Sequence, residues 1–150
     1  MGVEQLRSFL RRHSRIALDT SAFTYQLEAN EKYVALTDSV FSWLERPNHE
    51  AVTSTITMTE LLVPSYRDHD EARVDAFYGL LTTHPNLRWI APDLETADLA
   101  AKLRAAYRLR TPDALQAATA VRGEATGFVT NDPAFARVKE FETAVLDQLL

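Results

Sequence analysis

One stretch of the sequence, residues 111–132, limits the fold more than any other. It has the sequence TPDALQAATAVRGEATGFVTND. The Thr-Pro-Asp start and the apolar run after it predict a helix, and the later Gly-Phe-Val-Thr run predicts a strand. Asp113 then lies in the first turn of a helix, and Asp132 lies just beyond the carboxyl end of the next strand. In an alternating α/β chain, both positions belong to the sheet edge that binds ligands.

The same alternation of helix and strand runs through the rest of the chain. Runs rich in β-forming residues predict five strands, at residues 15–19, 51–56, 87–91, 127–130 and 143–146. Helical patterns separate them, at residues 23–28, 31–45, 57–63, 71–83, 94–107 and from 111, with a short helical turn at 133–138. Because crossovers between parallel strands are right-handed, we expect an α/β fold with a parallel five-stranded sheet and helices on both faces.

The chain before the first strand carries its own amphipathic pattern. Val3, Leu6, Phe9 and Leu10 fall on one side of a predicted helix over residues 1–15. This helix packs either on the domain itself or on a partner. We therefore expect one domain over residues 1–150, with a helical extension at 1–14 and a core at 15–150. A chain of 150 residues can bury a core without disulfides or a structural metal.

Composition narrows the class of protein further. There is no cysteine, which excludes disulfides and thiolate metal sites. Neither a signal-peptide pattern nor an apolar run of membrane-spanning length is present, so the sequence predicts a cytoplasmic protein without membrane contact. The net charge of -5 is opposite to that of most nucleic-acid-binding proteins. If several acids are gathered at one metal site, however, the positive and negative charges on the remaining surface are nearly equal in number.

Four carboxylates stand at boundaries between predicted elements, and each has a purely structural explanation. The four are Asp19, Glu60, Asp113 and Asp132. Asp19 and Asp132 are of a residue type favoured at helix caps. Glu60 follows Thr57 by three residues, as in a capping box. Asp113 follows Thr111 as a plausible cap, and there it complements the helix dipole.

Taken together, the four acids point to a metal. All of them fall at the carboxyl edge of the predicted sheet, and metal ligands must converge whereas helix caps need not. Four carboxylates in one place repel one another and raise their pKa values unless a cation compensates. Oxygen ligands without a Cys or His cluster favour Mg²⁺ or Mn²⁺ over zinc.

These motifs resemble those of the PIN-domain nucleases. The resemblance rests on Asp19-Thr-Ser-Ala after an apolar strand, Glu60 after the second strand, Asp113-Ala-Leu-Gln-Ala-Ala at a helix start and Thr130-Asn-Asp132 at the end of a later strand. It covers residues 15–150 and is greatest for the small VapC-type toxins of prokaryotic toxin–antitoxin pairs. Such toxins usually begin at the first strand, whereas this chain has about 14 residues before it.

The resemblance implies a fold and a function. It implies a PIN-like three-layer α/β/α fold with sheet order 3-2-1-4-5, and a divalent-metal-dependent endoribonuclease that acts as the toxin of a VapBC-type pair. Asp19 and Asp113 would be the central ligands of Mg²⁺ or Mn²⁺, completed by Glu60 and Asp132 directly or through water. RNA would be the substrate, a cognate antitoxin the partner and a homodimer the assembly. Attack by water would leave a 5′-phosphate.

Other residues are candidates for supporting roles. Ser21 and Thr130 place hydroxyls beside the acids, where turn or cap chemistry is the alternative role. A basic group, Lys102, Arg104, Arg108 and Arg110, precedes the Asp113 helix, with Arg104 and Arg108 four residues apart on one helical face. This group either holds RNA phosphates or is a solvated helix end.

Two further motifs invite a functional interpretation. Asp68-His69-Asp70 is expected to be a solvated turn rather than a metal site. The early aromatic residues are expected to be mostly core, although in VapC-like toxins this region helps to form the groove for the antitoxin. They are Phe23, Tyr25, Tyr33, Phe41 and Trp43.

Two alternatives remain open from the sequence, and a third is disfavoured. The chain is a stand-alone RNA-processing nuclease, or it is a catalytically silent PIN-like module that binds protein or RNA. An aspartyl-phosphate receiver, which shares the doubly wound architecture, would need paired acids near the first strand and a lysine after the last. The sequence contains neither feature.

Overall fold

A computed structural model describes residues 2–150 of the chain. Its five strands are β1 (Arg15–Leu18), β2 (Glu50–Ser54), β3 (Leu87–Ile90), β4 (Gly127–Thr130) and β5 (Glu142–Val145). Its helices are α1 (Gly2–Arg11), α2 (Thr20–Leu27), α3 (Val34–Leu44), α4 (Thr55–Arg67), α5 (Glu71–Thr82), α6 (Leu94–Tyr107) and α7 (Thr111–Arg122), with 3₁₀ helices η1 (Pro133–Arg137) and η2 (Leu146–Leu149). Within residues 2–150, no helix is long and apolar enough to cross a membrane.

The strands form one parallel sheet with the order β3-β2-β1-β4-β5. This confirms the predicted α/β fold and the predicted strand order. The chain moves outward from β1 in one direction to β3 and then returns to start again at β4. The topological switch point therefore lies between β1 and β4, whose ends are in register at Leu18 and Val129. Loops that follow these two strands leave the same edge of the sheet, where ligand sites form in such folds.

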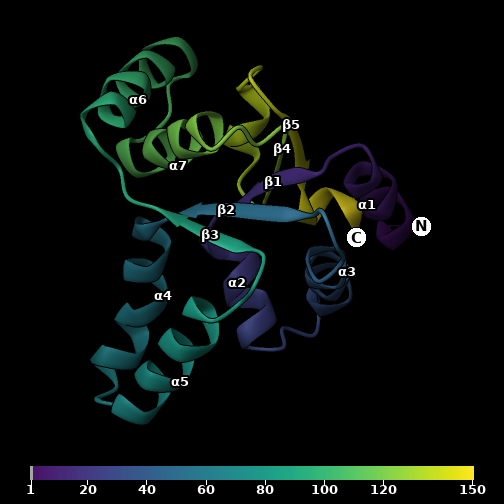
Figure 1. The fold of residues 1–150 in the computed structure, drawn as a ribbon, viewed down its shortest axis with the longest axis vertical. Coiled ribbons are helices and arrows are strands. Elements are labelled where there is room, and N and C mark those ends of the chain that lie inside the picture. The colour runs from purple at the N-terminus through teal and green to yellow at the C-terminus, as the bar shows by residue number, and fades with distance from the viewer. Residues whose placement is uncertain (1) are drawn as a thin grey trace.

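Helices cover both faces of the sheet, as the apolar strands require. Helices α6 and α7 lie on one face, and α2 to α5 lie on the other (Figure 1). Successive strand residues point to opposite faces, so Ile16 and Leu18 join the core beneath α2 and α3, whereas Ala17 joins the core beneath α6 and α7. The two cores make this a three-layer α/β/α domain.

Two helix caps differ from the predicted ones. Ser54, not Thr57, caps α4, and its hydroxyl accepts a hydrogen bond from the Ile56 backbone at 3.2 Å. The predicted capping box between Thr57 and Glu60 is therefore wrong, because the helix begins one turn earlier. At α7 the N-cap residue is Arg110, without a side-chain cap bond, so Thr111 is helical rather than capping.

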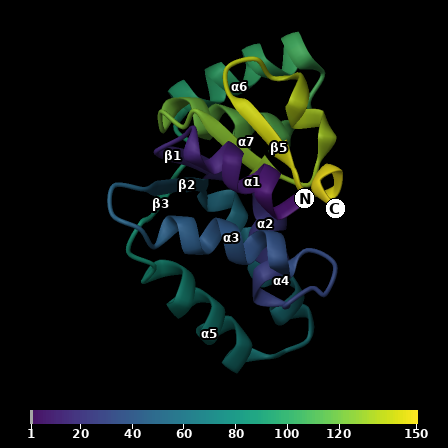
Figure 2. The same cartoon turned by 90° about the vertical axis from the view of Figure 1, so that its right-hand side faces the viewer.

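The N-terminal extension belongs to the domain. Helix α1 packs against α3 and the C-terminal η2, so the two ends of the chain lie close together (Figure 2). Leu6, Phe9 and Leu10, from the predicted apolar side, are buried in the core on the α3 face. Of the two possibilities left open by the sequence, packing on the domain is the one that the structure contains.

The Leu10→Ala substitution is expected to lower the free energy of unfolding by about 2–5 kcal/mol, because it deletes methyl groups from a close-packed site. Leu10 is 1% exposed. Chemical denaturation measures the change, with Gln5→Ala on the exposed side of the same helix as the control. A Leu10→Ala protein as stable as the control would show that α1 does not contribute to the folded domain.

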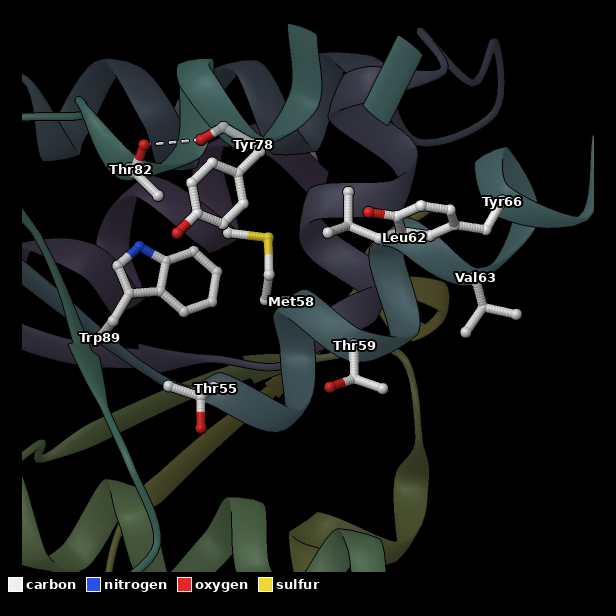
Figure 3. Close-up of a pocket in the computed structure, with 9 residues that line it drawn as sticks. All are labelled: Thr55, Met58, Thr59, Leu62, Val63, Tyr66, Tyr78, Thr82 and Trp89. Carbon is white, nitrogen blue, oxygen red and sulfur yellow. Dashed lines mark hydrogen bonds between the residues drawn. The ribbon is translucent and has the colours of Figure 1, made fainter. Parts of the chain in front are cut away.

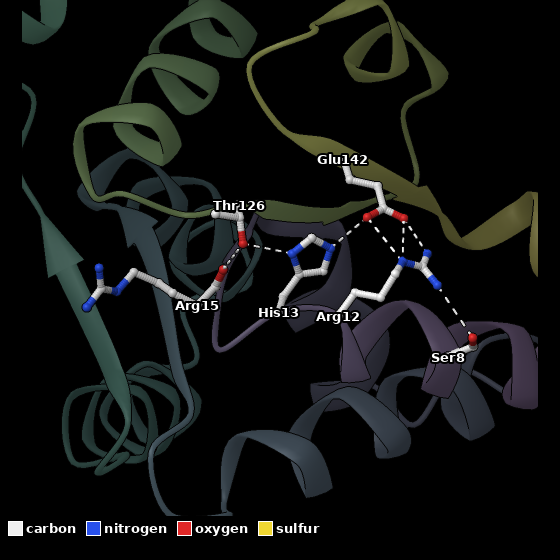
Figure 4. Close-up of polar contacts among 6 residues, drawn as sticks. All are labelled: Ser8, Arg12, His13, Arg15, Thr126 and Glu142. Carbon is white, nitrogen blue, oxygen red and sulfur yellow. Dashed lines mark hydrogen bonds and ion pairs between the residues drawn. The ribbon is translucent and has the colours of Figure 1, made fainter.

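A polar cluster fastens the end of α1 to the edge of the sheet (Figure 4). The His13 ring lies between two partners, with Nδ1 2.7 Å from the Thr126 hydroxyl and Nε2 2.9 Å from Glu142 Oε2. Arg12 donates to both oxygens of the same carboxylate, from Nε at 3.1 and 3.3 Å. These bonds hold the pKa of Glu142 below its ordinary value, chiefly through Arg12.

Glu142→Gln is expected to destabilise the protein by about 1 kcal/mol at low salt, because the Glu142 side chain is 42% exposed and solvent screens the ion pair. Since the folded-state pKa is lowered, the stabilisation is present at neutral pH and is lost as the pH falls through that value. Chemical denaturation at pH 7 and pH 3 measures the loss of stability caused by Glu142→Gln, with Glu31→Gln as an exposed control. A difference from the control that grows as the pH falls would contradict this account.

Candidate metal and catalytic site

Asp19 is the most deeply placed of the four predicted acids. It follows β1, caps α2 and is 9% exposed. Its Oδ1 accepts hydrogen bonds from the Ser21 hydroxyl at 2.6 Å and the Ser21 backbone at 3.1 Å, and its Oδ2 accepts one from the Thr130 hydroxyl. Burial raises the pKa of Asp19 to about 6, although these hydrogen bonds oppose the rise and the charge of Asp113 adds to it.

Ser21 and Thr130 connect Asp19 to the segment that follows β4. The Ser21 hydroxyl oxygen accepts from the Asn131 backbone at 3.0 Å, and the Thr130 hydroxyl oxygen accepts from the Asp132 backbone at 3.0 Å. Each hydroxyl therefore both donates to Asp19 and fixes the backbone beyond the neighbouring strand. The two strands of the switch point thus hold one carboxylate in a single orientation.

Asp113 lies close enough to Asp19, and Asp132 close enough to Asp113, for their charges to interact, and both are more exposed to solvent than Asp19. Burial raises the pKa of Asp113, and the nearby charge of Asp132 raises it further, whereas Arg110 opposes the shift through a 3.3 Å bond to Asp113 Oδ2. Asp132 caps η1, because its Oδ1 accepts from the Ala134 backbone at 2.9 Å. Capping and proximity to the other acids are therefore compatible for both Asp19 and Asp132.

Three of the predicted acids line one pocket of about 330 Å³ at the carboxyl edge of the sheet. Glu60 reaches it from α4 and accepts a hydrogen bond from the Thr20 hydroxyl at 2.8 Å. Asp132 stands beside Asp113 without lining the pocket. The lining residues are Asp19, Thr20, Ser21, Thr24, Tyr25, Glu60, Asp113 and Gln116.

The donor set of this pocket fits a hydrated divalent cation. Its acidic oxygens are hard ligands, and Asp19 is a buried carboxylate without a cationic partner among its hydrogen bonds. Within residues 2–150, no three acidic or histidine side chains are gathered closely enough to hold a metal by themselves. Mg²⁺ commonly keeps several waters and binds through one or two carboxylates, so a site of this kind does not need three protein ligands.

Gln116 is a pocket residue that the sequence did not indicate. It lies one helical turn after Asp113 on α7, is 5% exposed and lines the pocket with the acids. A single polar residue in an Ala-rich helix gives no functional signal. The available clue is that Gln116 falls on the side of α7 that also carries Asp113, because residues three apart on a helix share a face.

The predicted basic group does not lie on one helical face. Arg108 ends α6 in the left-handed conformation, with φ of 56°, so it does not share a helical face with Arg104. This part of the prediction is wrong. The Arg104 Nε donates to the Leu109 carbonyl at 3.0 Å, and the Lys102 ammonium pairs with Asp98. Arg110 is 80% exposed and is the member of the group that contacts an acid of the site.

The Asp68-His69-Asp70 segment forms a structural turn. Asp70 caps α5 by accepting from the Arg73 backbone at 3.0 Å, and Asp68 pairs with the Arg73 side chain. The early aromatic residues also follow the prediction, since Phe23, Tyr33 and Trp43 are buried in the core.

A larger hollow of about 560 Å³ lies elsewhere, between α4, α5 and β3 (Figure 3). Its lining is apolar and aromatic and includes Met58, Tyr66, Tyr78 and Trp89, without any acidic residue. Tyr66 and Tyr78 are 60% and 54% exposed. Because it carries no group for acid, base or metal chemistry, this hollow is not the candidate catalytic site despite its size.

Several solved structures have folds similar to that of this chain. VapBC-1 from nontypeable Haemophilus influenzae matches with a TM-score of 0.68 and 19% identity, over 89% of this chain and 98% of that chain. A toxin–antitoxin complex from Klebsiella pneumoniae matches with a TM-score of 0.63 and 21% identity, over 87% of this chain and 96% of that chain. FitAcB from Neisseria gonorrhoeae matches with a TM-score of 0.63 and 20% identity, over 85% of this chain and 95% of that chain.

These identities establish similarity of fold alone, and no curated protein matches the sequence. The family model of the PIN domain, however, matches residues 16–141 of the 150, from the first buried residue of β1 to the residue directly before β5. It spans all four acids and both strands of the switch point. The chain therefore belongs to the PIN domain family.

Proposed function

We propose that the protein is a divalent-metal-dependent endoribonuclease. PIN domains are nuclease domains, which supports a hydrolase acting on nucleic acid. The observation that carries the proposal is that two desolvated carboxylates, Asp19 and Asp113, face one pocket at the switch point of the sheet. Burying two neighbouring acids is costly unless a cation neutralises them.

Asp19 and Asp113 would hold Mg²⁺ or Mn²⁺, with Glu60 and Asp132 acting directly or through water. The cation would lower the pKa of bound water and neutralise charge on the phosphate. Ser21 and Thr130 fix the orientation of Asp19, so this ligand is preorganised before substrate binds. The exposed Arg110 guanidinium, next to Asp113, is placed to hold a phosphate of the RNA chain.

The proposed reaction is hydrolysis of a phosphodiester. A water oxygen forms a bond to phosphorus, the bond from phosphorus to the 3′ oxygen breaks, and a proton passes to that leaving oxygen. The products are a 3′-hydroxyl and a 5′-phosphate. The pocket acids would orient the water and accept its proton.

Incubation of purified protein with total RNA tests this function. Cleavage is expected with added Mg²⁺ or Mn²⁺ and is expected to stop in excess EDTA, and the fragments should carry 5′-phosphates. Cleavage that continues in EDTA would contradict metal dependence. Cleavage of DNA alone would contradict the choice of RNA.

We also propose that the protein is the toxin of a toxin–antitoxin pair and forms a homodimer. The similar folds belong to toxin–antitoxin complexes, which supports a cognate antitoxin. Exposed apolar side chains on α4 and α5, including Tyr66, Tyr78 and Leu80, support a protein partner. Light scattering tests the dimer. Growth arrest on expression, relieved by a neighbouring small reading frame, tests the toxin role.

The stand-alone nuclease and the silent module remain as alternatives with distinct outcomes. A stand-alone nuclease would cleave RNA without arresting growth. A silent module would bind RNA or protein without cleaving in any metal. The acids that line the pocket favour an active enzyme, because a binding module has no need of buried carboxylates.

A further inference from the structure

Gln116 ends a buried chain of polar groups that begins inside the sheet. Its amide nitrogen lies 2.8 Å from the Thr57 hydroxyl, which lies 2.9 Å from the Thr53 hydroxyl. The Thr53 hydroxyl in turn lies 2.8 Å from the Leu18 carbonyl, directly before Asp19. Thr53 and Thr57 are at most 1% exposed. This row of hydrogen-bonded groups thus connects β1, β2, α4 and α7 behind the acid pocket.

The number of hydrogens available for these contacts fixes which end of the Gln116 amide faces Thr57. Each threonine hydroxyl has one hydrogen to donate. If the Gln116 nitrogen is at Thr57, then Gln116 donates to Thr57, Thr57 to Thr53, and Thr53 to the Leu18 carbonyl. With the amide reversed, Thr57 would have to donate to Gln116, and the three contacts would share only two hydrogens. The nitrogen therefore faces Thr57 and the carbonyl oxygen is directed away from it.

The Gln116 carbonyl oxygen has no protein partner within residues 2–150, where the amide makes a single hydrogen bond, to Thr57. It is not enclosed away from solvent, because it is absent from the buried unsatisfied atoms of those residues, and Gln116 lines the acid pocket. Gln116 is 5% exposed and lines the acid pocket, and its carbonyl oxygen is an acceptor that no protein group of residues 2–150 satisfies. This oxygen is therefore free to bind a water molecule or a ligand.

We propose that Gln116 is a ligand-binding residue of the pocket, whose carbonyl oxygen contacts the hydrated divalent cation directly or through a bound water. Thr57 is a positioning residue that acts by holding the Gln116 amide. The inference rests on the proposed function, because it requires a cation at Asp19 and Asp113. A neutral amide oxygen suits such a pocket, since it adds a hard oxygen ligand without a further negative charge.

Binding of Mn²⁺ alone, measured by titration calorimetry on the purified full chain, tests the inference without an activity assay. Gln116→Met keeps the side-chain length and removes the acceptor, and is expected to weaken Mn²⁺ binding about tenfold or more. Gln116→Glu places a carboxylate at the same point and is expected to tighten binding by about tenfold. Gln148→Glu adds the same charge at an exposed position and should leave the affinity unchanged.

Two substitutions at Thr57 separate positioning from packing. Thr57→Val keeps the shape but removes the hydroxyl, so Gln116 loses its anchor and Mn²⁺ affinity should fall. Thr57→Ser removes a methyl group but keeps the hydroxyl, so it should lose stability while retaining the affinity. A purely structural role for Thr57 predicts the same affinity for both variants.

The outcomes separate this inference from the proposed function. If the native protein binds Mn²⁺, Asp19→Asn abolishes binding and both Gln116 variants bind like the native protein, then the inference is overturned and the metal site stands. If a Gln116 variant fails to fold, the Thr57 pair decides in the same way. If the native protein shows no saturable Mn²⁺ binding, both the inference and the proposed metal site are overturned.

Discussion

Replacing Asp19 or Asp113 with asparagine is expected to reduce RNA cleavage about 1000-fold or more. Each substitution removes a charged ligand from the pocket while keeping the size of the side chain. Loss of the charge stabilisation that a bound cation provides costs several kcal/mol, and about 4 kcal/mol corresponds to this factor in rate. Single-turnover cleavage of a labelled RNA at saturating Mg²⁺ measures the effect.

Asp98→Asn is the matched control, because the Asp98 side chain is 71% exposed and pairs with Lys102 on the surface of α6. It should cleave at the native rate. Circular dichroism of all three variants verifies the fold. A folded Asp19→Asn or Asp113→Asn protein that cleaves within a few-fold of the native rate would remove that residue from the mechanism.

Asp19 is also expected to make the metal-free protein less stable as the pH rises. Its folded-state pKa, about 6, is above the ordinary value of 3.8, so the folded protein holds this proton more tightly than the unfolded chain does. The contribution of Asp19 to the free energy of unfolding is therefore most favourable below pH 4, and it decreases as the pH rises to 6. A shift of this size corresponds to about 3 kcal/mol of unfolding free energy.

Chemical denaturation in EDTA between pH 4 and 8 measures this effect as the difference between the native protein and Asp19→Asn. The native protein should lose stability relative to the variant across pH 4–6, because the variant has no carboxylate to ionise. Mn²⁺ at pH 7.5 should restore the stability of the native protein and leave the variant unchanged. A difference that is constant with pH would show that Asp19 is not desolvated.

The strands were predictable because buried parallel strands give short apolar runs bounded by turn residues. The run before Asp19 and the run before Asn131 both lie within one residue of the observed β1 and β4. Helix boundaries were less predictable. Helix α2 begins directly after Asp19, three residues before the predicted start at Phe23, because the cap made by Asp19 extends it.

Helix α4 also exceeds its prediction. It continues through Pro64 to Arg67, beyond the predicted end at residue 63. Proline lacks a backbone donor and is disfavoured inside a helix, but the Pro64 carbonyl still accepts from the Asp68 backbone at 3.0 Å. The left-handed conformation of Arg108 could not be predicted either, because no sequence pattern marks the non-glycine residues that adopt it.

The positions of Asp19, Asp113 and Asp132 at one sheet edge were predictable because these residues follow strands or begin a helix, whereas Glu60 lies in the second turn of α4. The groups that orient them were less so. Ser21 and Thr130 are local neighbours of predicted acids and were identified with them. The hydrogen bonds that run from Leu18 through Thr53 and Thr57 to Gln116 join four elements, and these residues meet only in the folded protein.

The central claim is that Asp19 and Asp113 share one divalent cation. A crystal soaked in Mn²⁺ and measured at the manganese absorption edge tests it most directly. The account predicts an anomalous peak in the acid pocket, with carboxylate oxygens of Asp19 and Asp113 at about 2.0–2.3 Å, typical of small divalent cations. A pocket without a peak at millimolar Mn²⁺, or a peak bound by other residues alone, would contradict it.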